Sequence, residues 1–202
     1  LLAGGVWAGA WLLLRGAPGP VRAAVCAAVP WLVTGFMHLD GYMDVCDAVL
    51  SRRDLATRQR ILKDSHCGAF AVICMVLLAM GQWSLFLAAE DVSWLGLLLI
   101  PAATRACAGL AVLGLRPMGT SQYAAMGPAR GGYGAALWVL LALSVGLPLW
   151  LDGSFGPLAA AVGYGLAVWY GFRNLDGMSG DISGFALTIG ELCGCGAAIL
   201  WR

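Results

Sequence analysis

Long apolar stretches separated by short polar segments make up most of the chain. A bilayer core needs about 20 mostly apolar residues to be crossed by a helix, so stretches nearly free of Lys, Arg, Asp and Glu are candidate spans. They cover residues 1–14, 23–37, 67–89, 94–115, 131–151, 153–172 and 182–201. The pattern predicts an all-α, polytopic transmembrane bundle of six or seven spans, in which residues 1–202 form a single domain.

Composition favours lipid as the surrounding solvent. Apolar residues make up 60% of the chain and charged residues 11%, whereas soluble proteins carry about a quarter charged residues. The 29 glycines fit this class, because small residues let membrane helices approach closely. A transmembrane barrel is excluded by the continuous rather than alternating apolar runs.

The remaining global features add little. A formal net charge of +1 gives no support for binding to nucleic acid. The seven cysteines lack CxxC spacing, so we interpret them as small packing residues.

The chain begins at Leu1 rather than Met and its first apolar stretch is short, so we expect the natural N-terminal part to be missing.

The positions of the basic residues predict an orientation. Short cytoplasmic loops carry an excess of Lys and Arg. Residues 38–68 hold Arg52, Arg53, Arg58, Arg60 and Lys63, whereas the next loop holds only Glu90 and Asp91. We therefore expect the 38–68 segment to face the cytoplasm, with the loops at 116–130 and 173–181 on the same side and Asp152 opposite. Arg15 and Arg22 are exceptions to this rule, because the predicted arrangement places them on the side opposite the cytoplasm.

The 38–68 segment carries a stripe of acids. Asp40, Asp44 and Asp47 are spaced i, i+4, i+7, which places them within about 60° on one helix face. Like charges on neighbouring turns repel, and a divalent cation such as Mg²⁺ removes that penalty through oxygen ligands. The alternative is a solvated helix face, although such faces usually mix signs. Asp54 is interpreted as structural.

Two further motifs flank this stripe. Lys63 is suited to contact phosphate, with Asp64 as metal ligand or base and Ser65 as substrate contact; helix capping by Asp64 or Ser65 is the alternative. His38 and His66 are candidate general bases, or hydrogen-bonded fixtures, because imidazole titrates near neutral pH.

The later spans hold a second group of candidates. Arg105 lies near mid-span, where a charge needs a carboxylate or phosphate partner. Glu191 in the last span is a candidate partner for it. In the loop NLDGMSGDISG, Gly180 allows close approach of a phosphate and Asp181 is a further candidate metal ligand, although an ordinary turn also explains the loop.

Three strings in this chain resemble the cobalamin synthase family, the adenosylcobinamide-GDP ribazoletransferases. They are HLDGYMDVCD from His38, ILKDSHCGAFA around Lys63, and GMSGDISG, which contains Gly180 and Asp181, in order along essentially the whole chain. The family's N-terminal stretch is absent, Ala48 replaces an expected Gly, and Asp176 and Gly177 stand where a Gly pair is expected.

The resemblance implies a membrane enzyme in the bacterial or archaeal inner membrane, with its active site facing the cytoplasm. It would join adenosylcobinamide-GDP to α-ribazole or α-ribazole phosphate and release GMP. Mg²⁺ or another divalent cation is the implied cofactor, held by Asp40, Asp44, Asp47, Asp64 and Asp181. Our interpretation of the residues fits this reaction: the candidate catalytic residues are His38, Asp44 and Asp64, and the candidate substrate contacts are Lys63, Ser65, Arg105 and Gly180.

Other classes fit less well. A CDP-alcohol phosphotransferase also uses clustered aspartates at the membrane interface, but Gly41 is not followed by its Ala-Arg pair. A cation-coupled transporter would also place charges among its spans, yet most acids lie at one interface. An intramembrane aspartyl protease needs two separated aspartates rather than a cluster. A homo-oligomer is compatible with the sequence, which leaves the oligomeric state open.

Overall fold

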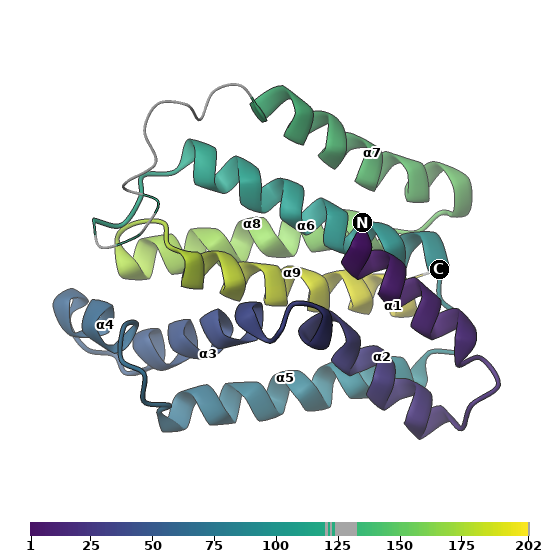
Figure 1. The fold of residues 1–202 in the computed structure, drawn as a ribbon, viewed down its shortest axis with the longest axis horizontal. Coiled ribbons are helices and arrows are strands. Elements are labelled where there is room, and N and C mark those ends of the chain that lie inside the picture. Colours follow the sequence, from purple (N-terminus) through teal and green to yellow (C-terminus); the bar gives the residue numbers. More distant parts are fainter. Residues whose placement is uncertain (120, 122, 124–132, 202) are drawn as a thin grey trace.

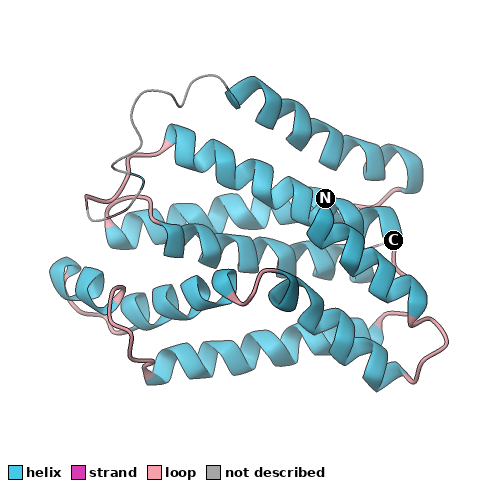
Figure 2. Cartoon of the chain, viewed as in Figure 1, coloured by secondary structure: helices cyan, strands magenta, loops and turns pink. Residues whose placement is uncertain are grey.

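The computed structural model describes residues 1–119, 121, 123 and 133–201 (Figure 1). Over these residues the chain is all-helical, as predicted, and the only β feature is an isolated bridge between Pro117 and Met178 (Figure 2). The helices are α1 (Leu2–Leu13), α2 (Gly19–Val33), α3 (Met37–Leu50), α4 (Leu55–Ile61), α5 (Ala69–Ala88), α6 (Trp94–Gly114), α7 (Gly134–Asp152), α8 (Gly156–Leu175) and α9 (Gly180–Leu200).

Helix α9 is the centre of the bundle. In Figure 1 it lies between α3 and α5 on one side and α6 and α7 on the other, and it packs most extensively against α8. Its glycines make this possible: a Cβ at Gly190 would lie 2.8 Å from the carbonyl oxygen of Ala160, and one at Gly194 would lie 2.9 Å from the Ala160 Cβ. Small residues therefore let the central helix pack closely, as predicted.

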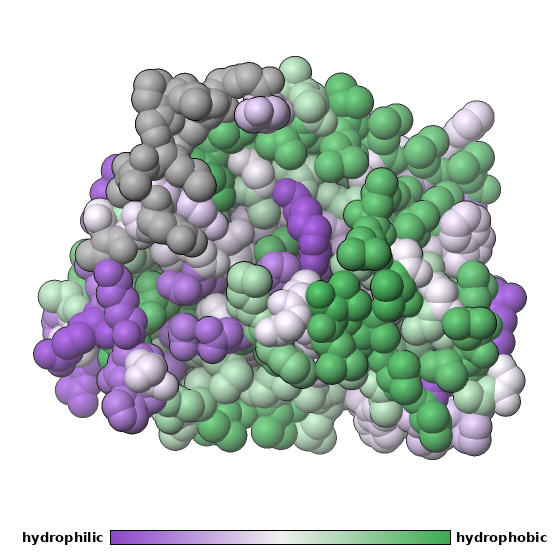
Figure 3. Space-filling model, viewed as in Figure 1, coloured by the Kyte–Doolittle hydropathy of each residue, from purple (hydrophilic) through white to green (hydrophobic). Residues whose placement is uncertain are grey.

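The outer helices expose apolar side chains. Leu77 on α5 is 64% exposed and Trp150 on α7 is 82% exposed, and Figure 3 shows an extended apolar surface. Among the described residues, helices α5, α6, α7 and α9 are long and apolar enough to cross a membrane, and the bent pair α2–α3 raises the number of such spans to at most five. The chain thus has the surface of a multi-pass membrane protein, while the count of six or seven spans stays a prediction.

A sharp break separates α2 from α3. The two helices meet at 90°, and the turn between them holds Gly35 and Phe36 with φ of 58° and 64°. Because glycine adopts positive φ without steric cost, Gly35 suits this turn. The break ends the apolar helix at Val33 and starts the acidic helix in a new direction.

The three predicted polar segments meet at one end of the bundle. Arg58 donates hydrogen bonds to Asn174, at 3.2 Å to the backbone oxygen and 3.1 Å to Oδ1. Arg116 is hydrogen-bonded and ion-paired with Asp176 in the loop before α9. Asp152 and the Arg15–Asp91 ion pair belong to the opposite end, where Figure 1 shows the α1–α2 and α7–α8 turns. The predicted grouping is thus confirmed for the described parts of these segments, whereas Arg130 and most of the 116–130 loop lie outside the described residues.

Candidate active site

Helix α3 is amphipathic and presents its acids on one side. Leu39, Tyr42, Val45 and Val49 are buried in the core. Asp40 is exposed, and Asp44 and Asp47 are half-buried. The structure therefore confirms that the three acids lie on one continuous helix, and the opposite apolar face fixes the direction in which they project.

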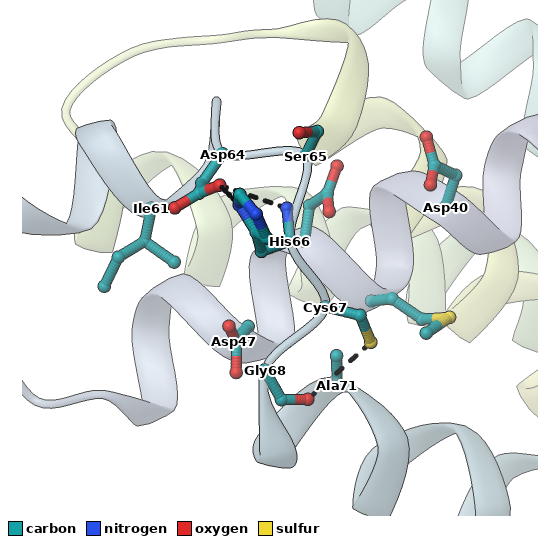
Figure 4. Close-up of a pocket in the computed structure, with 11 residues that line it drawn as sticks. Asp40, Asp47, Ile61, Asp64, Ser65, His66, Cys67, Gly68 and Ala71 are labelled. Carbon is teal, nitrogen blue, oxygen red and sulfur yellow. Dashed lines mark hydrogen bonds and ion pairs between the residues drawn. The ribbon is translucent and has the colours of Figure 1, made fainter.

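The acids of two motifs line one cavity. This α3–α5 cavity, of about 240 Å³, lies between α3 and the segment that joins α4 to α5. It is lined by Asp40, Met43, Asp44, Asp47, Ile61, Asp64, Ser65, His66, Cys67, Gly68 and Ala71 (Figure 4). Four of the predicted metal ligands therefore share one cavity, and exposed Cys67, which we interpreted as a packing residue, is part of its wall.

Gly68 provides the closest contact between the two motifs. A Cβ at this position would overlap the carboxylate of Asp47, which lies beside Gly68 in Figure 4. Only a residue without a side chain leaves room for that carboxylate in its present position. The glycine is needed because of a carboxylate about twenty residues away in the chain, a contact that no local pattern could predict.

Asp64 and His66 form a local pair. The Oδ1 atom of Asp64 accepts a hydrogen bond of 3.0 Å from the His66 backbone N–H and lies 2.6 Å from Nδ1 of the same residue. This side-chain hydrogen bond lowers the pKa of Asp64 and raises the pKa of His66. Gly68 is the N-cap residue of α5 and no side chain caps this helix, so the alternative that Asp64 or Ser65 caps it is wrong.

Asp54 has the structural role expected of it. Its side chain caps α4 by accepting hydrogen bonds from the backbone N–H and the hydroxyl of Thr57, at 3.0 and 2.8 Å. These bonds lower the pKa of Asp54. An acid in this position stabilises the helix N-terminus, and it does not line the α3–α5 cavity.

Two further cavities adjoin the first. The α3–α9 cavity, of about 260 Å³, is lined by Met37, His38, Asp40, Tyr123, Gly180, Asp181, Ser183, Gly184 and Leu187. The Lys63 cavity, of about 210 Å³, is lined by Leu62, Lys63, Met118, Ser121, Ser179, Gly180 and Asp181. Asp40 is common to the first two cavities, and Gly180 and Asp181 are common to the last two. The predicted site residues other than Arg105 thus line three neighbouring cavities.

Glycines bring α3 and α9 together at this point. A Cβ at Gly41 would lie 2.8 Å from the backbone oxygen of Asp181, and one at Gly184 would lie 3.0 Å from that of His38. The close approach brings Asp181 near enough for electrostatic interaction with Asp44. Sequence reasoning missed these glycines, because nothing local shows what a glycine faces.

Arg105 lies outside the walls of these cavities, although it is close enough to His38 for an electrostatic interaction. It forms an ion pair with Glu191, whose side chain is 6% exposed, and also donates hydrogen bonds to Pro101 O and Thr104 Oγ1 at 3.2 and 3.3 Å. It lines none of the three cavities formed by the described residues. The structure therefore favours the predicted pairing with Glu191 over a phosphate contact.

Comparison with known proteins identifies the family. The sequence model of the family described as cobalamin-5-phosphate synthase matches residues 1–199. The chain belongs to this family. An adenosylcobinamide-GDP ribazoletransferase of Clostridium perfringens strain 13 is 33% identical over 205 residues, which cover 96% of this chain and 81% of the relative. One of Thiobacillus denitrificans is 36% identical over 203 residues, covering 94% and 78%. No solved structure matches the chain.

The donor atoms of this cobalamin-5-phosphate synthase family member suit a hard divalent cation. Asp44 lies within electrostatic range of Asp40, Asp47 and Asp181, so four carboxyl groups gather where the α3–α5 and α3–α9 cavities meet. Among the described residues, no three acid, His or Cys side chains are close enough together to hold a metal on their own. Mg²⁺ is usually held by one or two carboxylates together with substrate phosphates, so the site fits a cation that binds with its substrate.

Proposed function

We propose that the chain transfers the cobinamide-phosphate moiety of adenosylcobinamide-GDP to α-ribazole or its phosphate and releases GMP. The relatives that share most of its length are named for this transfer. The observation that carries the proposal is the α3–α5 cavity, in which acids from two separate motifs face one another. A diphosphate bridged to carboxylates by a cation is the ligand that such a site suits.

The reaction is a phosphoryl-type transfer. The attacking hydroxyl oxygen of the ribazole forms a bond to the phosphorus next to cobinamide, the bond from that phosphorus to the bridging oxygen breaks, and GMP leaves with the electron pair. His38 or a carboxylate takes the hydroxyl proton. Asp40, Asp44, Asp47, Asp64 or Asp181 would hold Mg²⁺, which would neutralise charge at the diphosphate and on the leaving group.

The remaining motif residues have positions that suit phosphate groups. Lys63 and Gly180 line the Lys63 cavity, and Ser65 lines the α3–α5 cavity. A lysine ammonium, a hydroxyl and glycine backbone at the start of α9 can each contact phosphate oxygens. We assign these contacts to the substrate, and we assign Arg105 to the internal pair with Glu191.

We also propose the predicted membrane arrangement. The end of the bundle that holds the cavities carries Arg52, Arg53, Arg58, Arg60, Lys63, Arg116 and Arg173, and Figure 3 shows its polar surface. The excess of basic residues supports a cytoplasmic position for this end in the inner membrane. In this arrangement α1 is the end of the first span and α2 begins the second, which breaks into α3. Helices α5, α6, α7, α8 and α9 supply the others, which gives the six or seven spans predicted.

The test is product formation by the purified protein in lipid vesicles. Adenosylcobinamide-GDP, α-ribazole and Mg²⁺ should together give GMP and adenosylcobalamin in equal amounts, and omission of either substrate should give neither. A CDP-alcohol and its acceptor serve as the control for the related enzyme class. Turnover of that control alone, or ion flux without GMP, would contradict the proposal.

A further inference from the structure

Two of the cavities have a common wall but different chemistry. The α3–α5 cavity is lined mainly by acids, by polar side chains of the α4–α5 segment and by Gly68. The α3–α9 cavity also has an acid of its own, Asp181, but it adds His38, Ser183 and apolar surface from Met37, Tyr123 and Leu187. Asp40 belongs to both, so a group bound in one cavity can meet a group bound in the other at this residue.

The proposed reaction needs such a division. Its donor carries a diphosphate, whereas its acceptor is a riboside with a flat, apolar aromatic base. Pockets for small molecules are mostly apolar and begin at about 300 Å³, close to the volume of about 260 Å³ of the α3–α9 cavity. The donor is far larger than either cavity, so only its diphosphate can enter between α3 and α5.

We propose that the α3–α9 cavity is the acceptor subsite, which binds the aromatic riboside, and that the α3–α5 cavity receives the diphosphate of the donor. This inference rests on the proposed function and specifies where its two substrates bind. The base packs against Met37, Tyr123 and Leu187, and the ribose points toward Asp40. The attacking hydroxyl and the phosphorus then meet at the common wall.

The division separates the roles of the candidate catalytic groups. Asp44 and Asp64 line the donor cavity, where a carboxylate serves the diphosphate and its cation. His38 and Asp181 line the acceptor cavity, within reach of the hydroxyl that must lose its proton. The proton therefore leaves toward the α9 side, while GMP departs on the α5 side.

Two methionines on α3 provide a matched test. Met37 lines only the acceptor cavity and Met43 only the donor cavity, six residues apart on one helix. Each substitution to Ala removes the same thioether chain. KM for each substrate is measured with the other at saturation, on the full chain in lipid vesicles, together with kcat and the melting temperature. Met37 is 72% exposed, so Met37→Ala should fold normally. If the melting temperature of Met43→Ala is lower than that of the unmodified chain, Met43→Leu is used in its place.

We expect Met37→Ala to raise KM for α-ribazole roughly five- to tenfold and to leave KM for adenosylcobinamide-GDP within twofold, because one apolar contact is lost. Met43→Ala should show the reverse preference. A raised donor KM in Met37→Ala, equal changes for both substrates, or no change in either would overturn the assignment. Absence of turnover in the unmodified chain would instead contradict the proposed function.

Discussion

Gly68 offers a sharp test of the site's geometry. It precedes α5 in an extended conformation, with φ of −87° and ψ of 170°, which an alanine adopts without strain. The Cβ of Gly68→Ala would nevertheless overlap both carboxylate oxygens of Asp47. Because Asp47 is half-buried and its carboxylate is the far end of a side chain, the carboxylate can move aside while the helices stay in place.

The size of this movement sets the expected effect. Restoring an ordinary contact requires a displacement on the order of 1 Å, and a misplacement of that size at a reacting centre can cost about 100-fold in rate. We therefore expect kcat for GMP release to fall roughly 100-fold. The melting temperature should change little, since no buried apolar contact is lost.

The assay is initial GMP release in lipid vesicles, with Gly81→Ala as the matched control. Gly81 lies within α5, the helix that Gly68 precedes, and a Cβ at Gly81 would meet nothing within 4 Å. The control should therefore keep its activity within about twofold. If Gly68→Ala also keeps full activity, the position of the Asp47 carboxylate does not matter for the reaction, and the proposed role of Gly68 is wrong.

Three further outcomes are expected. Glu191→Gln leaves the Arg105 guanidinium without its buried counter-charge and should lower the free energy of unfolding by about 3 kcal/mol; unfolding in detergent measures this, and an unchanged stability would disprove the role of the pair. Gly41→Ala places a Cβ 2.8 Å from the Asp181 backbone, so we expect a loss of about 1–3 kcal/mol together with activity, and unchanged melting would contradict the close approach of α3 and α9. Chelation by EDTA should abolish GMP release and added Mg²⁺ should restore it; turnover that persists in EDTA would exclude the cation.

Local periodicity predicted the acid stripe. Asp40, Asp44 and Asp47 fall on one face by helix geometry alone, and the structure confirms that they lie on α3. The same kind of local signal identified Asp54 as structural, because a cap acts within its own first turn. Long apolar runs likewise predicted the helices, since their length and composition do not depend on distant contacts.

Contacts between distant segments could not be predicted from the sequence. Gly41 and Gly184 matter because of what faces them across the α3–α9 interface, and Gly68 because of a carboxylate on another helix. No local pattern encodes these neighbours. The break between α2 and α3 was also missed, because an apolar run does not show where the chain turns by 90°.

Asp44→Asn tests whether the acid-lined α3–α5 cavity performs the transfer. The substitution preserves shape and removes one charge from the cavity wall. Asp91→Asn is the control, because it makes the same change in an exposed ion pair at the opposite end, worth about 0–1 kcal/mol. We predict that GMP release falls at least about 100-fold in Asp44→Asn and less than twofold in Asp91→Asn. Equal activity of the two variants would contradict the claim.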